Sequence, residues 1–180
     1  MRSNAILAAC ALALVAACRA GDQANEDAAS NNLIESAETR TAAAEPLSRE
    51  KALALMKERH DGMEQIGDET KKISNQLKSS SPDVAAIQQS AAKIAGLAPK
   101  AKTWFPEGTG PDVGKTRAKP EIWQKPEDFT AKDRDFEQAV AQFKAAADSG
   151  DLSQINATFS ALGKTCKACH DSYRSPEDNH

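Results

Sequence analysis

The chain has 180 residues, of which 40% are hydrophobic but only 4% aromatic, and its formal net charge is −3. The length allows one folded domain with additional segments, and a mildly acidic chain without a basic stripe argues against a nucleic-acid partner. Frequent alanine and few β-branched runs favour helices over sheets.

The N-terminal segment has the pattern of an export signal. Arg2 precedes an apolar run over residues 5–17 that is too short and too alanine-rich for a stable membrane span, which predicts a signal peptide over residues 1–17. The run ends at Cys18 in the letters VAAC, which resemble the bacterial lipobox, where the cysteine is acylated and becomes the first mature residue. We expect a periplasm-facing protein held on a bacterial membrane only by a lipid on Cys18; an ordinary signal peptide cut nearby is the alternative.

The next segment, residues 18–46, is rich in Ala, Asn, Glu, Asp, Ser and Thr and has almost no large apolar side chain. It cannot bury much surface, so it predicts a flexible polar tether. The folded domain is expected over residues 47–175, and residues 176–180 form a polar tail.

The folded domain opens with two predicted helices. The first runs from an N-cap at Ser48 to about Ser79, because its apolar positions recur at spacings of three and four. The second covers residues 82–100, with Ser81 as its cap and Pro82 in its first turn.

An irregular connection follows over residues 104–129, because its prolines and glycines exclude a continuous helix. It carries both tryptophans, Trp104 and Trp123, so much of it should pack on the helices. A connection of this length is usually functional or covers something.

The third predicted helix opens at Thr130, with Asp133 in a capping-box-like position, and ends at Gly150. The fourth opens at Asp151 with Gln154 in the same pattern, and its apolar stripe runs into the letters CKACH. The sequence therefore predicts an all-α, antiparallel four-helix bundle with this motif on the C-terminal helix.

The CKACH motif at residues 166–170 is the C-x-x-C-H attachment sequence of a c-type haem. Cys166 and Cys169 lie on one face of a helix, so both thiols can form thioethers with the two vinyl groups of one porphyrin. His170 can then turn its imidazole to the iron as the proximal axial ligand. We therefore predict one covalent haem c.

Three other interpretations of the motif remain. A thioredoxin-like redox pair expects a βαβ pattern, which the sequence lacks. A zinc site needs about four ligands, and beyond His170 the only histidines are His60 and His180, with no second cysteine pair in the mature chain. Chance occurrence is the third. The export signal favours haem, because c-type haem is attached outside the cytoplasmic membrane.

Several segments together resemble the cytochrome c′ family, the class II c-type cytochromes, over residues 47–175. These are CKACHDSYR at 166–174, FPEGTG at 105–110, TRAKPEIW at 116–123, and the first-helix segment from Arg49 to Met63. The resemblance implies a four-helix haem domain with thioethers at the two cysteines of CKACH and its histidine on the iron.

The resemblance also implies roles for residues around the haem. Arg174 matches an arginine on the proximal side, and Arg49 matches an arginine near the haem propionates. Glu50 departs from the Gln that is frequent in the family, and a carboxylate there should turn away from the propionates. Leu53 matches the bulky apolar residue that covers the iron in high-spin, five-coordinate members.

Met56 is the alternative distal ligand. It lies on the Leu53 face one turn along, and a methionine sulfur on the iron would make a low-spin electron carrier. Core packing also accounts for Met56, and we expect Leu53 to cover the iron. His60 lies roughly 10 Å of helix rise from Leu53 and is expected to be a surface residue, as is His180.

The sequence thus predicts an exported haem protein that transfers electrons, binds diatomic gases such as NO and CO, or does both. A low-spin His/Met cytochrome that only carries electrons is the alternative. We expect no enzymatic activity, because Leu53 offers no acid or base over the iron. Redox proteins are the expected partners, and the resemblance suggests a homodimer joined through the first two helices.

Overall fold

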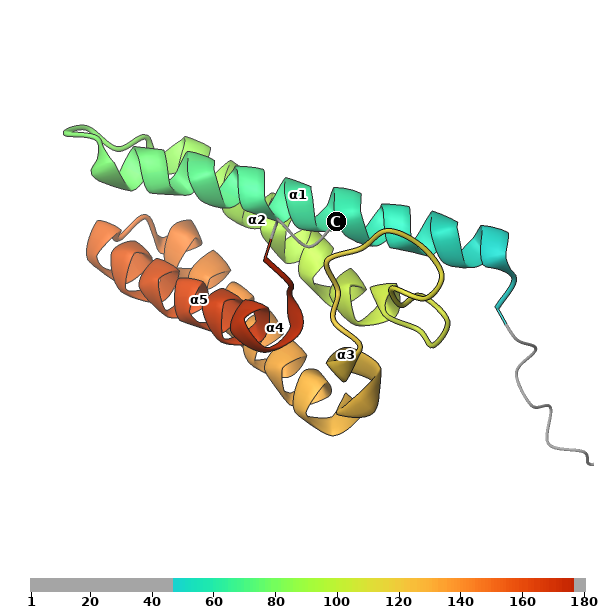
Figure 1. The fold of residues 1–180 in the computed structure, drawn as a ribbon. Coiled ribbons are helices and arrows are strands. Elements are labelled where there is room, and N and C mark those ends of the chain that lie inside the picture. The colour runs from blue at the N-terminus through green and yellow to red at the C-terminus, as the bar shows by residue number, and fades with distance from the viewer. Residues whose placement is uncertain (1–46, 177–180) are drawn as a thin grey trace, which may run out of the picture. The chain divides into compact units, whose positions relative to one another are not determined.

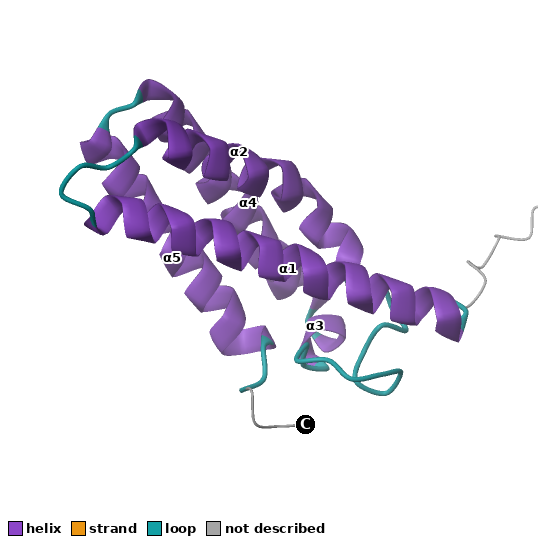
Figure 2. Ribbon diagram, turned by 90° about the horizontal axis from the view of Figure 1, so that it is seen from above, coloured by secondary structure: helices purple, strands orange, loops and turns teal. Residues whose placement is uncertain are grey.

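The computed structural model describes residues 47–176, which form helices joined by turns and one long connection (Figures 1 and 2). The elements are α1 (Arg49–Lys78), α2 (Val84–Ala101), the 3₁₀ turn η1 (Lys102–Trp104), α3 (Glu121–Gln124), α4 (Pro126–Ser149) and α5 (Leu152–Tyr173). The described residues contain no strand beyond one isolated bridge. The predicted all-α four-helix bundle is confirmed, with α1, α2, α4 and α5 as its long helices.

The predicted signal peptide, the tether with Cys18, and the tail from residue 177 lie outside the described residues. Within the described range, no helix combines the length and the apolar character that a membrane crossing requires.

Two helices begin where the sequence predicts. The Ser48 hydroxyl accepts a hydrogen bond from the Lys51 amide at 3.4 Å. The Asp151 carboxylate accepts from the amides of Ser153 (2.8 Å) and Gln154 (3.2 Å), and the Gln154 side chain donates back to it at 2.9 Å. These bonds satisfy amides that have no partner inside the helix.

The other two predicted helix starts were wrong. The cap of α2 is Asp83, whose carboxylate accepts from the Ala86 amide at 3.1 Å, and Pro82 precedes the helix. Helix α4 begins at Pro126, four residues before Thr130. A proline is tolerated in the first turn because the N–H group that it lacks would have no hydrogen-bond partner inside the helix. The connection is correspondingly shorter and contains the short helix α3.

The long helices pack in chain order, α1 on α2, α2 on α4, and α4 on α5. Of the described helices, α1 and α5 lack a comparable interface with each other, so one side of the bundle is not closed by helix packing. Each buried aliphatic or aromatic side chain stabilises the fold by about 1.5–3 kcal/mol. The large ones at the centre are Ile66, Ile73, Ile87, Ile94, Val140, Phe143, Ile155 and Leu162.

One buried carboxylate links α1 to α2. Glu69 is 6% exposed and accepts hydrogen bonds from Ser90 (2.7 Å), Lys72 (2.8 Å) and Lys93 (3.0 Å). These donors lower the pKa of Glu69 to about 2 and keep it ionised at neutral pH.

The connection packs on the helices, as predicted. Trp104 is 1% exposed and lies against Gly62 of α1. The Trp123 indole donates to the carbonyl oxygens of Phe105 (3.1 Å) and Pro106 (3.0 Å), which holds two parts of the connection together.

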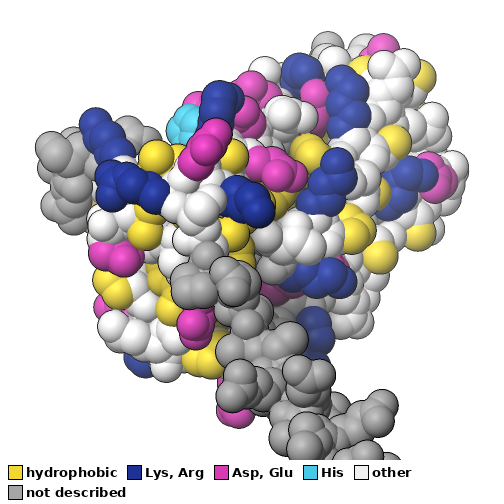
Figure 3. Space-filling view, turned by 90° about the vertical axis from the view of Figure 1, so that its right-hand side faces the viewer, with side chains coloured by type: hydrophobic (Ala, Val, Ile, Leu, Met, Phe, Trp, Pro, Cys, Tyr) yellow, Lys and Arg dark blue, Asp and Glu magenta, His cyan; other side chains and the backbone are white. Residues whose placement is uncertain are grey.

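Charges of both signs are mixed on one face of the molecule. On the face drawn in Figure 3, the described lysine and arginine side chains are intermixed with aspartate and glutamate side chains and with hydrophobic ones. Salt at physiological concentration largely screens interactions between exposed charges that lie farther apart than a Debye length of about 8–10 Å.

Candidate haem-binding site

The C-terminal half of α5 presents the two thiols. Cys166 and Cys169 are free and half-buried, and Cys166 packs against the hydrophobic core. Burial raises the pKa of both thiols, that of Cys169 to about 11. A thioredoxin-like pair depends on a lowered thiol pKa, so these surroundings do not favour that interpretation.

The imidazole of His170 follows the thiols on the same helix. The residue as a whole is exposed, but its ring is partly removed from water by the surrounding atoms. This desolvation, together with the positive charges of Arg174 and Arg117, lowers the pKa of His170. A lowered pKa favours the neutral imidazole, which is the form that ligates iron. Among residues 47–176, no group of three or more His, Cys, Asp or Glu side chains is arranged to hold a metal ion.

The connection pairs with the chain just beyond His170. Residues 117–119 run antiparallel to residues 173–175. The Lys119 amide donates to the Tyr173 carbonyl at 3.0 Å, and the Ser175 amide donates to the Arg117 carbonyl at 2.8 Å. The Arg117 guanidinium also donates to the Ser175 carbonyl, at 3.0 and 2.9 Å. These bonds fix the end of α5 and bring Arg117 near the imidazole of His170.

Aromatic side chains join the end of α5 to α4 and to the connection. The buried hydroxyl of Tyr173 donates to a carboxylate oxygen of Asp128. The Phe129 ring meets the ring of Tyr173 edge-on at 5.3 Å and that of Phe105 at 4.9 Å. Such pairs add about 0.5–1.5 kcal/mol beyond the area that they bury.

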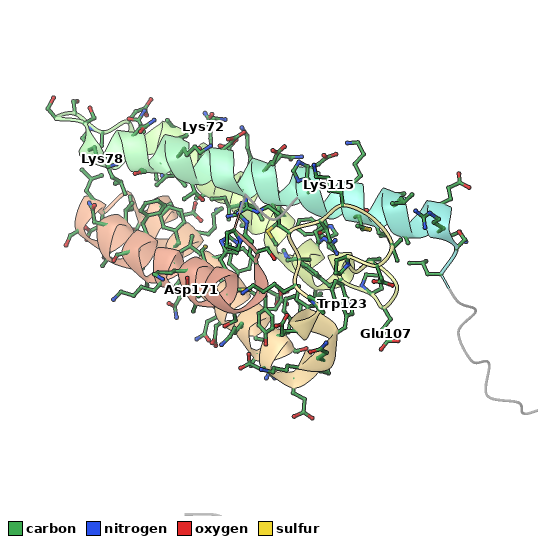
Figure 4. All side chains as sticks on the ribbon, viewed as in Figure 1. Lys72, Lys78, Glu107, Lys115, Trp123 and Asp171 are labelled. Carbon is green, nitrogen blue, oxygen red and sulfur yellow. The ribbon has the colours of Figure 1, made fainter. Side chains whose placement is uncertain are left out.

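Helix α1 supplies the distal candidates. Leu53 is 41% exposed, whereas Met56 is only 6% exposed. Both lie against Gly114 of the connection: a Cβ built on that glycine would be 2.7 Å from Cδ2 of Leu53 and 3.4 Å from Cε of Met56. In Figure 4, the neighbouring Lys115 lies beside α1. The connection therefore packs on the side chains expected to line the distal side.

Other predicted residues lie at the surface. Arg49 is the first residue of α1 and is exposed, as is Arg174 directly after α5. His60 is also exposed, with its Nε2 3.4 Å from a carboxylate oxygen of Glu64.

Sequence reasoning missed two residues of the region, Arg59 and Arg117. Arg59 is 5% exposed, although arginine is almost never fully buried unless paired. The missed signal was its position, because it falls in an apolar stripe of α1 at the helical spacing of Ala52, Met56, Met63 and Ile66. Arg117 lay in a segment that resembled the family, but no role was assigned to it.

Known proteins share this architecture. A family model described as Cytochrome C′ matches residues 54–174. The chain belongs to the cytochrome c′ family. A cytochrome c′ from Pararhodospirillum photometricum is 36% identical over 124 residues, which cover 67% of this chain and 96% of that protein.

Solved cytochrome c′ structures agree with the fold. One is the nitric oxide complex of a leucine-to-isoleucine mutant from Alcaligenes xylosoxidans, with 30% identity and a TM-score of 0.63. Another is a cytochrome c′ with ligand-controlled dimer dissociation, with 30% identity and a TM-score of 0.65. Each comparison covers 72% of this chain and 98% of the other.

Cytochromes c′ carry a single covalently attached haem c, and the residues of this chain fit that group. Two free, half-buried thiols and an imidazole with a lowered pKa lie within five residues of each other on α5. On α1, the Leu53 side chain contacts Gly114 of the connection and still leaves 41% of its surface exposed. When bound, the haem iron supplies one-electron chemistry and an axial position for a ligand.

Proposed function

We propose that this cytochrome c′ transfers single electrons and binds small neutral gases such as NO and CO at a five-coordinate, high-spin iron. In this assignment Cys166 and Cys169 hold the haem by thioethers, His170 is the proximal ligand, and Leu53 covers the distal side. Arg49 lies near the propionates and Arg174 on the proximal side.

The exposed side chain of Leu53 is the observation that carries this proposal. Leu53, at 41% exposed, is the more exposed of the two large hydrophobic side chains that lie at the surface of the described residues, and a haem face would bury it. Hydrocarbon gives water and anions no hydrogen bond, so it disfavours them over neutral diatomics. The nitric oxide complex of a relative's leucine mutant supports the same assignment.

The second candidate is a low-spin His/Met electron carrier. It is favoured by one observation: Met56 and Leu53 contact the same glycine, so the sulfur lies close to the distal leucine. The burial of Met56, at 6% exposed, supports packing instead.

Absorption spectra of the haem-loaded protein separate the two candidates. We expect a high-spin ferrous spectrum that shifts on adding CO, a faster CO association in Leu53→Ala, and an unchanged spin state in Met56→Ala. A low-spin spectrum in the parent protein that becomes high-spin in Met56→Ala would establish the alternative and overturn the five-coordinate proposal.

We also propose that the protein is exported and lipid-anchored, on the basis of the signal-like segment and Cys18. In a host that matures c-type cytochromes, the parent protein should enter the membrane fraction and Cys18→Ala should be released into the periplasm. Recovery of the parent protein in the soluble periplasm would show that Cys18 carries no lipid anchor.

A homodimer is a further proposal, supported by the relative whose dimer dissociates under ligand control. Sedimentation velocity of the haem-loaded protein, with and without CO, tests it. A monomer at all concentrations in both states would rule it out.

A further inference from the structure

The guanidinium of Arg59 is buried on α1 among neutral oxygens. One nitrogen, Nη1, donates to the Trp104 carbonyl and to the Thr109 hydroxyl, both at 3.3 Å. The other, Nη2, donates to the Thr109 carbonyl at 3.1 Å and to the Thr116 hydroxyl at 2.9 Å. The guanidinium carbon also lies 4.9 Å from the centre of the Phe105 ring, in cation–π distance.

Every one of these partners belongs to η1 or to the connection between η1 and α3. The side chain bonds to Trp104 at the end of η1 and to Thr109 and Thr116 of the connection, although these residues are 45 to 57 positions from Arg59 in the chain. Burial lowers the pKa of Arg59 to about 10, so the group remains charged at neutral pH. Charge-assisted bonds of this kind are stronger than those between neutral groups.

The held segment includes Gly114, two residues before Thr116. This is the glycine that lies against Leu53 and Met56, and a methyl group added to it would be 2.7 Å from Cδ2 of Leu53, so the Leu53 side chain would have to shift. A segment fastened on both sides of Gly114 cannot withdraw from α1 without breaking the bonds to Arg59. The position of the Leu53 side chain is thus limited by a backbone that Arg59 holds.

We propose that Arg59 is a positioning residue for the distal side: by fastening residues 104–116 to α1 it keeps Gly114 against Leu53 and so controls how readily a diatomic gas reaches the iron. This inference rests on the proposed function, because it takes Leu53 as the distal cover. Arg59 itself acts through the connection and not on the ligand.

A double-mutant cycle on the haem-loaded protein tests the link, with the CO association rate as the readout. Gly114→Ala should change that rate in the parent protein, because the added methyl presses on Leu53. In the Arg59→Gln background the same substitution should have an effect smaller by roughly threefold or more, because the released segment can move away. Equal effects in the two backgrounds, or no effect of Gly114→Ala, would overturn the proposal.

Amide hydrogen exchange gives a second readout that does not depend on the iron. Arg59→Gln should speed amide exchange in residues 109–116 by about tenfold while α4 and α5 keep their protection. In Arg59→Lys the exchange rate should lie between those of the parent protein and Arg59→Gln, because lysine keeps the charge but not the two nitrogens that donate in different directions. Lys57→Gln, a change of an exposed cation on the same helix, is the matched control and should leave the segment unchanged. Unchanged exchange in Arg59→Gln would refute the fastening.

The spectrum of the parent protein and the exchange measurement distinguish a failure of the proposed gas binding from a failure of the proposed role of Arg59. A low-spin parent spectrum would remove the proposed gas binding, while faster exchange in Arg59→Gln would still establish the fastening. If Arg59→Gln does not fold, Thr116→Val removes the shortest of the four bonds, at 2.9 Å, and takes its place in both experiments.

Discussion

Replacing Gly62 with alanine should destabilise the protein although alanine is the better helix former. A Cβ at this position would lie 2.3 Å from Cη2 and 2.5 Å from Cζ2 of the Trp104 ring, distances that real Cβ atoms do not show. Trp104 is 1% exposed, its indole nitrogen donates to Glu58 at 3.3 Å, and its backbone carbonyl accepts from Arg59. The ring therefore has little freedom to move.

The expected size follows from two opposing effects. Overpacking of a rigid, buried ring costs about 1–3 kcal/mol or more. Exchanging glycine for alanine inside a helix recovers about 1 kcal/mol. The net loss in the free energy of unfolding should therefore be about 0–2 kcal/mol, which lowers the midpoint temperature by up to several degrees in a domain of this size.

Thermal and denaturant unfolding of the haem-loaded proteins, followed by far-ultraviolet circular dichroism, measures this loss. Gly96→Ala is the matched control, because Gly96 is an exposed glycine of α2 with no atom within 4 Å of the added Cβ. The control should be stabilised by up to about 1 kcal/mol. If Gly62→Ala were as stable as Gly96→Ala, the packing of the connection on α1 would be other than described.

Three further outcomes are expected. Since the pKa of Glu69 falls from 4.5 to about 2 on folding, its contribution to the free energy of unfolding is complete above pH 4.5 and is lost as the pH drops toward 2. Acid unfolding followed by circular dichroism should therefore depend less steeply on pH in Glu69→Gln, and identical slopes would contradict this. Burial and the bond to Asp128 raise the pKa of Tyr173, the single tyrosine, from 10 to about 12, so its contribution is complete below pH 10 and lost as the pH rises toward 12. Tyr173→Phe should cost about 1–3 kcal/mol at neutral pH and abolish that alkaline loss, and a phenol titrating near pH 10 in the parent protein would disprove the shift. Phe143→Ala, which empties the centre of the core, should cost about 3–5 kcal/mol in denaturant unfolding, and a loss below about 1 kcal/mol would mean that the core is arranged differently.

The sequence predicted most of the helical framework, because local signals determine it. The caps at Ser48 and Asp151, the end of α4 at Gly150, and the apolar spacing of α1 all act within a few residues. The start of α4 was misjudged because Pro126 was read as a residue that excludes helix, whereas a proline in the first turn is well tolerated.

Long-range contacts around the site could not be predicted in this way. The burial of Arg59 depends on acceptors 45 to 57 residues away, and the pairing of residues 117–119 with 173–175 spans a similar distance in the chain. The positions of Cys166, Cys169 and His170 followed from a local motif, but the close packing of Gly114 on Leu53 depends on how the connection folds back.

The central claim is that one haem is bound through two thioethers on α5. Mass spectrometry of the intact protein, matured in a host that makes c-type cytochromes, tests it most directly, with alkylation of the remaining free thiols in the same sample. We predict a mass increased by one haem and no alkylation at Cys166 or Cys169. An apoprotein mass with both thiols alkylated under those conditions would contradict the account.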